Sequence, residues 1–195
     1  LYNGATWMKQ RVETNIGGLH TGMDGATKTG YYLRKHMNAQ VSLNPVSPLG
    51  KEHHFPLFRY AEILLNYAEA MYHWVGEDTK PTDYPYSARE ALNLVRDCAD
   101  MKHVEETGNA FLERLRNERR IELAFEDHRF WDIRRWKTGE VVKNIYGVRI
   151  TGTDTNFTYS KVLVRQNQWD DKMYLFPFPQ EELYMNENLV QNPDW

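Results

Sequence analysis

Residues Asn117 to Trp136 read NERRIELAFEDHRFWDIRRW and hold five acidic residues, five arginines and four large aromatic residues in twenty positions. This stretch is the most informative part of the sequence. Its composition is compatible with an active site, with a solvated charged helix, or with a set of buried ion pairs. The helical positions of the acids separate these alternatives.

On a helical wheel that advances about 100° per residue, Glu118, Glu122 and Glu126 continue the stripe that Phe111 and Leu115 begin. A carboxylate on a buried stripe must be paired or protonated. Arginine is the natural partner, because its fork meets a carboxylate through two charge-assisted hydrogen bonds. The arginines of the same stretch can supply these partners. We therefore predict a structural ion-pair motif made of Glu118, Arg119, Glu122, Glu126, Arg129, Asp132 and Arg135.

Catalytic interpretations of the same residues are weaker. Glycoside hydrolysis needs two carboxylates beside the scissile bond; Glu118, Glu122 and Asp132 are candidates, but arginine partners would keep them ionised and remove the acid. A di-metal carboxylate site on helices uses Glu-x-x-His pairs, and the sequence contains none. The adjacent His53 and His54 are interpreted as solvated loop residues. We expect no enzyme, no cofactor and no metal; Asp170 and Asp171 alone are weak evidence for a calcium site.

Composition bounds the class of protein. The chain has 195 residues, 41% hydrophobic and 26% charged, with a net charge of −3, which is typical of a globular domain. The arginines are matched by nearby acids, so no basic patch indicates nucleic-acid binding. Apolar runs are too short to span a bilayer. The single Cys98 excludes an internal disulfide and a cysteine zinc site.

Helical periodicity begins at Pro56 and predicts a helix to Val75, capped by Gly76. Ser87 and Glu90 form a capping box, which predicts a second helix over 87–99 and an antiparallel helix hairpin. Further helices are expected over 109–126 and 129–136, and a helical turn over 180–184. Strands are expected at 30–35, 146–151, 157–164 and 172–176. The fold class is therefore mainly α, with tetratricopeptide-like helix pairs, a loop-rich N-terminal segment and a small β or irregular C-terminal part.

Several of these segments resemble one protein family. RYAEILLNYAEA (Arg59–Ala70), ALNLVR (Ala91–Arg96), NERRIELAFEDHRFWDIRRWKTG (Asn117–Gly139) and the tail YLFPFPQEELYMNENLVQNPDW are similar to motifs of the SusD/RagB family. GYYLRK (Gly30–Lys35) is similar to a further family segment. The tail departs from the pattern at Asp194, where a glycine is usual. The motifs follow the family order from about residue 30 to the last residue.

The resemblance implies a C-terminal SusD/RagB-type domain over 1–195, from a longer protein whose N-terminal helical repeats and lipid anchor lie outside this chain. It also implies a non-catalytic, surface-exposed lipoprotein of the outer membrane. Such a protein captures a glycan or other nutrient polymer and delivers it to a SusC-like TonB-dependent transporter. The alternative is a scaffold segment that docks the transporter, with the ligand site elsewhere.

Sugar rings bind to flat, exposed aromatic side chains with polar groups beside them. Aromatic residues in loops are therefore the candidates for glycan contact: Trp7, Trp169, Tyr84 and Tyr86. Aromatic residues on predicted helices are expected in the core: Trp74, Trp131 and Trp136.

Overall fold

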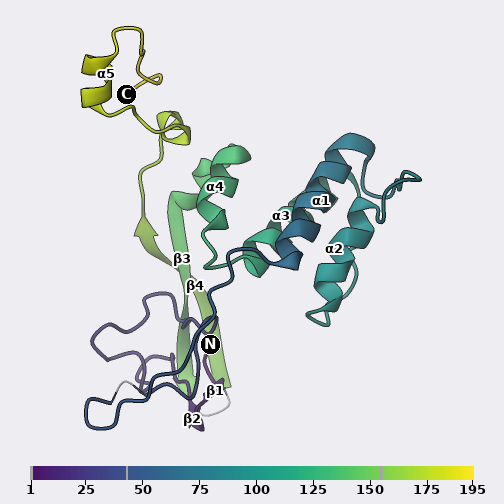
Figure 1. Cartoon of the computed structure of the whole chain (residues 1–195). Helices are drawn as coiled ribbons and strands as arrows, with labels where there is room; N and C mark the ends of the chain where they lie inside the picture. The colour runs from purple at the N-terminus through teal and green to yellow at the C-terminus, as the bar shows by residue number, and fades with distance from the viewer. Residues whose placement is uncertain (1, 43, 154–155) are drawn as a thin grey trace. The chain divides into compact units, whose positions relative to one another are not determined.

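The computed structural model describes residues 2–42, 44–153 and 156–195, and the chain forms two compact units (Figure 1). The first unit, here called the helical unit, is His54–Asp132. The second, here called the mixed unit, joins Leu1–His53 to Ile133–Trp195. The mixed unit is therefore discontinuous in the sequence.

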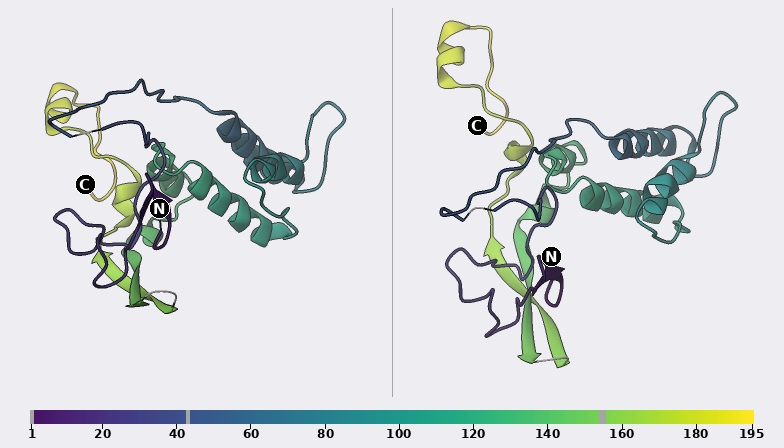
Figure 2. Two further views of the ribbon diagram at one scale, coloured as in Figure 1. Left: turned by 90° about the horizontal axis from the view of Figure 1, so that it is seen from below. Right: turned by 60° about the horizontal axis from the view of Figure 1, so that its bottom comes forward.

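Helices α1 (Tyr60–Val75), α2 (Ala88–Asp97) and α3 (Gly108–Glu122) build the helical unit, in which α4 (His128–Arg135) also begins. α1 and α2 lie side by side as a hairpin, and α3 packs against α1 (Figure 2). The largest side chains that are fully buried between them are Phe111, Leu65, Leu92 and Leu115. The prediction of a mainly α fold with a tetratricopeptide-like helix pair is confirmed.

The boundaries of the hairpin follow local chemistry. The Ser87 hydroxyl accepts a hydrogen bond from the Glu90 amide at 3.1 Å, and the Glu90 carboxylate accepts one from the Ser87 amide at 2.8 Å. This confirms the predicted capping box. α1 ends at Val75 as predicted, and Gly76 follows with φ +88°. The helix begins at Tyr60 and not at Pro56, because Arg59 is extended and directs its side chain to the end of α3.

The charged stretch is broken by a turn. α3 ends at Glu122, four residues earlier than predicted. Phe125 and Asp127 have φ +63°, a conformation that cannot continue a right-handed helix. α4 covers His128–Arg135, within one residue of the predicted helix at each end.

Strand pairs form the regular part of the mixed unit. β1 (Thr6–Trp7) and β2 (Gln10–Arg11) make a short hairpin, whose turn residues Met8 and Lys9 have positive φ. β3 (Asn144–Thr153) and β4 (Asn156–Gln166) pair antiparallel, with a register shift at Ile145 and Tyr146. The two strands predicted at 146–151 and 157–164 are confirmed and are longer than predicted.

The strand predicted at 30–35 is absent from the described residues. Instead, the backbone crosses β3 at one point, where the Val148 amide donates to the Thr29 carbonyl at 2.9 Å. Gly30 has φ +81°, and a Cβ atom there would lie 2.5 Å from the Val148 carbonyl oxygen. The chain therefore turns away from β3 at Gly30 and cannot run alongside it.

The strand predicted at 172–176 is also wrong. Residues Asp171–Tyr174 form a short 3-10 helix, η2, like Gly139–Val142, which form η1. The Tyr174 hydroxyl accepts a hydrogen bond from the Gly139 amide at 2.9 Å, which draws residue 174 inward. Helix α5 (Gln180–Met185) matches the predicted turn.

The C-terminal tail folds back on the segment before α5. The Gln191 side chain pairs with the Phe178 backbone in both directions, accepting from its amide at 2.8 Å and donating to its carbonyl at 3.0 Å. The Asn192 side chain donates to the Phe176 carbonyl at 2.6 Å, and the Trp195 indole donates to the Lys172 carbonyl at 3.0 Å. Through these hydrogen bonds, Gln191, Asn192 and Trp195 hold the tail against the segment before α5.

In the ranges that the structure describes, no helix has the length and apolar character needed to cross a membrane.

Candidate ligand-binding site

The acidic stripe of α3 is neutralised by arginine. Arg59, just before α1, meets two carboxylates at once: its Nη1 lies 2.7 Å from Glu122 Oε1 and its Nε 2.8 Å from Glu126 Oε2. It also donates to the backbone carbonyl of Glu122 at 2.9 Å. The hydrogen bond to Glu126 is the main reason that the pKa of Arg59 is raised above its ordinary value.

Two further ion pairs of the motif are buried. Arg96 of α2 pairs with Glu118, and its Nε also donates to the Lys102 carbonyl at 2.7 Å. Arg119 pairs with Asp132 at 2.7 Å, and its Nη1 donates to the Asn66 side chain at 2.6 Å. The side chains of Arg119 and Asp132 are only 6% and 4% exposed. These pairs tie α3 to α1, α2 and α4.

Two parts of the expectation need correction. Most of the arginine partners come from outside the stretch, since Arg59 and Arg96 lie in the two other helix motifs. Arg129 makes no ion pair within the described part of the chain. The expected ion pair of Arg135 stays a prediction, and its guanidinium lies over the Trp136 ring at 5.0 Å.

Trp169 does not offer a platform, and the expectation of an exposed ring is wrong. Its side chain is 6% exposed and packs against Gly139, where a Cβ atom would lie 1.8 Å from the indole. Tyr174 meets it edge-on at 5.1 Å, and the Arg134 guanidinium lies over it at 5.2 Å. The Trp169 ring is therefore packed inside the mixed unit, and neither of its faces is open to a ligand.

Trp7 and Tyr86 are half-buried. The Arg34 guanidinium lies 4.6 Å from the centre of the Trp7 ring, so one face of that indole is covered by a cation. The Tyr86 ring meets Tyr67 edge-on, and the Tyr86 carbonyl accepts a hydrogen bond from the Tyr67 hydroxyl at 2.6 Å. Tyr86 therefore anchors the inter-helix loop, whereas Trp7 keeps a partly accessible ring.

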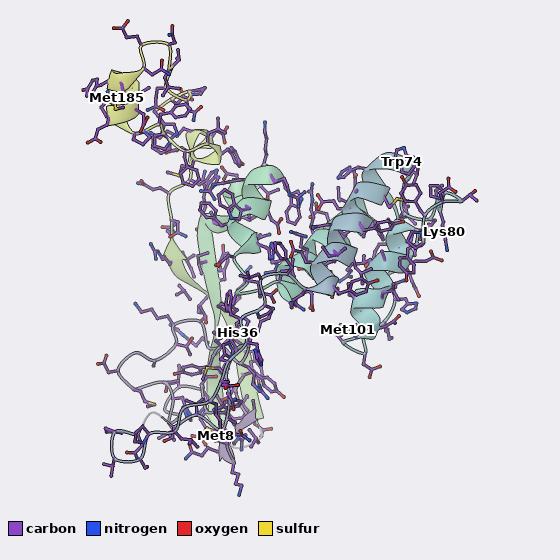
Figure 3. All side chains as sticks on the ribbon, viewed as in Figure 1. Met8, His36, Trp74, Lys80, Met101 and Met185 are labelled. Carbon is purple, nitrogen blue, oxygen red and sulfur yellow. The ribbon has the colours of Figure 1, made fainter. Side chains whose placement is uncertain are left out.

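Tyr84 has a partner that sequence reasoning missed. Trp74, in the last turn of α1, was expected in the core, but its side chain is 60% exposed and Tyr84 is 40% exposed. The two ring centres lie 5.2 Å apart at 63°. Trp74 stands near the C-terminal end of α1 (Figure 3). The wheel contained the signal, because Trp74 lies about 120° from the centre of the buried stripe of α1.

The loop that carries Tyr84 is held at both ends. Arg89 of α2 donates two hydrogen bonds to the Asp78 carboxylate, at 2.5 and 3.0 Å. Its Nη1 also donates to the carbonyls of Val104 and Glu106. The hydrogen bond from Arg89 lowers the pKa of Asp78. The capping box and the Tyr67–Tyr86 bond fix the other end. The aromatic pair is thus built on a helix end and a tethered loop.

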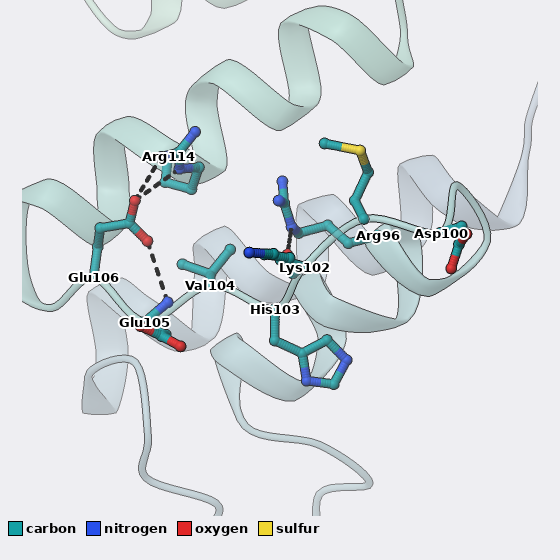
Figure 4. A pocket seen from close by; sticks show the side chains of 9 residues that line it. Arg96, Asp100, Lys102, His103, Val104, Glu105, Glu106 and Arg114 are labelled. Atoms are coloured by element: carbon teal, nitrogen blue, oxygen red, sulfur yellow. Dashed lines mark hydrogen bonds and ion pairs between the residues drawn. The ribbon is translucent and has the colours of Figure 1, made fainter.

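A larger cavity of about 770 Å³ lies between α2, the 100–106 loop and Arg114 (Figure 4). Among the described residues, no Phe, Tyr or Trp side chain lines it. Its arginines are occupied, because Arg96 pairs with Glu118 and Arg114 pairs with Glu106 at 2.6 Å. This cavity therefore lacks the flat aromatic surface against which a sugar ring packs.

The fold and this site together define a helix-hairpin protein with a fixed and exposed aromatic pair. Residues 1–195 match the SusD family model, and the chain belongs to this family. It is similar to SusD-like protein P2 of Formosa agariphila, with 32% identity over 138 residues, which are 69% of this chain and 24% of that protein. It is also similar to a crystal structure of a SusD-like protein from Bacteroides fragilis, with a TM-score of 0.77 and 28% identity, covering 100% of this chain and 37% of that one. The chain thus spans less than half the length of either relative.

Proposed function

We propose that this chain is part of a non-catalytic glycan-capture protein, in which Trp74 and Tyr84 contact a sugar ring. The observation that carries the proposal is the exposed edge-to-face pair of these two rings on a rigid helix end. Membership of the SusD family supports it, because the family is associated with glycan binding in polysaccharide uptake.

The chemistry around the pair suits a carbohydrate. A sugar presents apolar C–H faces and a rim of hydroxyl groups, so it needs an aromatic surface with polar groups beside it. The tip of the loop that carries Tyr84 supplies exposed polar residues: Thr79, Lys80, Thr82 and Asp83. Trp74 and Lys80 lie at the same end of the helical unit (Figure 3).

The tethered loop supports binding without a large entropic cost. Ordering a mobile loop on binding reduces affinity, and a loop that is ordered beforehand avoids this loss. Asp78, the Tyr86 carbonyl and the Ser87 amide are each held by a side chain on a helix, namely Arg89, Tyr67 and Glu90. Tyr84 is therefore held close to the position in which it meets Trp74.

The cellular role follows as part of the same proposal. A SusD-family protein of this kind would stand on the outer-membrane surface as a lipoprotein and pass oligosaccharides to a SusC-like TonB-dependent transporter. The second candidate function is transporter docking, with the ligand bound elsewhere. It is favoured by a run of exposed apolar side chains at the start of the hairpin, formed by Leu57, Phe58, Tyr60 and Ile63.

Affinity-gel electrophoresis against a panel of polysaccharides tests the proposal. We expect at least one glycan to retard the chain, and Trp74→Ala to bind that glycan about tenfold more weakly. Tyr184→Ala is the matched control, because it removes an exposed ring on α5 of the mixed unit. Trp7→Ala tests the remaining candidate ring in the mixed unit.

Equal retardation of Trp74→Ala and the unmodified chain would exclude the aromatic pair as the site. A loss in Trp7→Ala alone would move the site to the β1–β2 hairpin. No retardation by any glycan would favour the docking function.

A further inference from the structure

The turn between α3 and α4 lines an open surface pocket of about 440 Å³ that the proposed function does not use. It lies within the helical unit, and its volume falls in the range typical of small-ligand sites. Its lining combines three aromatic rings with one cation and one acid: Leu123, Phe125, Asp127, Arg129, Phe130 and Trp131.

The aromatic rings of this pocket are exposed. Trp131 was expected in the core, but its side chain is 60% exposed, and that of Phe125 is 65% exposed. Phe130 and Trp131 meet edge-on, with ring centres 5.1 Å apart. Phe125 itself has a positive φ and lies in the turn after the end of α3. Exposed apolar rings gathered around a cavity are typical of binding sites.

The cation of the pocket lacks the partner that its neighbours have. Arg129 is half-buried, and within the described residues no carboxylate pairs with it. Burial lowers the pKa of Arg129, and the positive charge of Arg120 lowers it further. Asp132 is close enough to act in the opposite direction, but its carboxylate is held by Arg119. A half-buried guanidinium without a counter-charge is stabilised by an incoming anion.

We propose that this pocket binds an acidic sugar residue, with Arg129 on its anionic group and the aromatic rings against its ring faces. The inference rests on the proposed glycan-binding function and adds the class of glycan, one that carries carboxylate or sulfate groups. A planar guanidinium meets either group through paired hydrogen bonds, and an aromatic ring meets the apolar face of the same residue. A 440 Å³ cavity with a single cation fits one such residue better than an extended chain segment.

The other charged residues around the pocket determine how tightly it binds an anion. Asp127 is exposed and lines the cavity, so it opposes an anion. Arg120 is exposed and donates to the Asn117 side chain at 2.8 Å, so it contributes only at a distance. Glu126 is held by Arg59 and Asp132 by Arg119. Two substitutions of opposite sign follow: Arg129→Gln weakens the site, and Asp127→Asn strengthens it, since Asn tolerates positive φ as well as Asp does.

The test is a titration of the full chain with D-galacturonate, galactose 6-sulfate and D-galactose, followed by NMR of the tryptophan indole N–H signals. We expect the acidic sugars to shift the Trp131 signal and to bind more tightly than galactose. Arg129→Gln should reduce this affinity about tenfold, whereas Arg129→Lys, which keeps the charge without the fork, should reduce it less. Asp127→Asn should raise it, and the control Arg120→Gln should change it little.

Several outcomes would overturn the inference. They are equal binding of galactose and both acidic sugars, unchanged binding in Arg129→Gln, or an equal loss in Arg120→Gln. A Trp131 signal that no sugar moves would also overturn it and would favour a polypeptide as the occupant. The Trp74 signal reports on the proposed function separately, so failure at one site is distinguishable from failure at the other.

Discussion

The helical unit and the mixed unit are stabilised by different interactions. The helical unit has a continuous apolar core, in which Leu65, Leu92, Phe111 and Leu115 are fully buried, and ion pairs surround it. In the mixed unit few apolar side chains are buried, and they are scattered: Val12, Ile133, Ile150 and Trp169. Its segments are joined mainly by backbone hydrogen bonds and by side chains that bond to backbone, such as Gln191.

This difference predicts where each unit is vulnerable. An apolar core with buried charges depends on each charge keeping its partner, because an unpaired buried charge is strongly destabilising. The mixed unit depends instead on places where another group packs directly against the backbone, as at Gly139. Such places have no room for an added side-chain atom. Substitutions in the two units should therefore differ in size and in the signal that reports them.

The largest effect is expected for Glu118→Ala in the helical unit. It leaves the guanidinium of Arg96 buried without its carboxylate, which costs about 3–5 kcal/mol. Scanning calorimetry should show a Tm lower by roughly 10 °C or more. Glu122→Ala should cost less, because the Glu122 and Arg59 side chains are each 28% exposed.

Glu113→Ala is the matched control on the same helix, since Glu113 pairs with Arg116 at the surface. It should change the free energy of unfolding by about 0.5 kcal/mol or less. If Glu118→Ala were as mild as this control, the pair would be solvated, and the contrast between the units would fail.

The next largest effect is expected for Gly139→Ala in the mixed unit. The added methyl group would lie 1.8 Å from the Trp169 indole, so the ring must move, at a cost of about 1–3 kcal/mol. Near-ultraviolet circular dichroism and tryptophan fluorescence should report the displaced ring. Gly22→Ala is the control, because nothing lies within 4 Å of a Cβ atom there. An unchanged fluorescence spectrum in Gly139→Ala would show that Trp169 is not packed on this glycine.

The sequence predicted features that depend on neighbouring residues and missed those that depend on how separate segments pack. Ser87 and Glu90 form their capping box three residues apart, so local pattern was sufficient. The stripe of α3 predicted that Glu118, Glu122 and Glu126 need arginine partners. It did not identify Arg59 and Arg96, because these partners depend on how separate helices pack.

The candidate site was predicted less well than the fold, for a related reason. Burial of Trp169 depends on Gly139, thirty positions earlier, which no periodic pattern connects to it. The exposure of Trp74 could have been predicted from the sequence, because its position lies off the apolar stripe of α1. The error was the assumption that a tryptophan on a helix is buried. That no described carboxylate pairs with Arg129 could be learned only from the packed structure, because the sequence offers several acids beside it.

A smaller effect is expected for Ser87→Ala. It removes the hydroxyl that accepts the Glu90 amide and should cost about 1 kcal/mol. Chemical denaturation should show a lower midpoint with an unchanged slope. A lower slope would instead indicate that the hairpin frays before the helical unit unfolds, which would make the unit less cooperative than its shared core implies.

The smallest effect is expected from pH, at the ion pair that tethers the Tyr84 loop. Arg89 lowers the pKa of Asp78 below its ordinary value of 3.8 in the folded chain, so the pair contributes stability above that value and loses it as the pH falls through the folded pKa. The Asp78 side chain is 63% exposed, so solvent screens most of this contribution. The difference in Tm between the unmodified chain and Asp78→Asn should therefore be slight at pH 7 and should vanish at strongly acidic pH. Glycan affinity is the sharper measurement: if the tether preorganises the platform, Asp78→Asn weakens binding at pH 7 with almost no change in Tm. Unchanged affinity would mean that Tyr84 is held by the capping box and the Tyr67 bond alone.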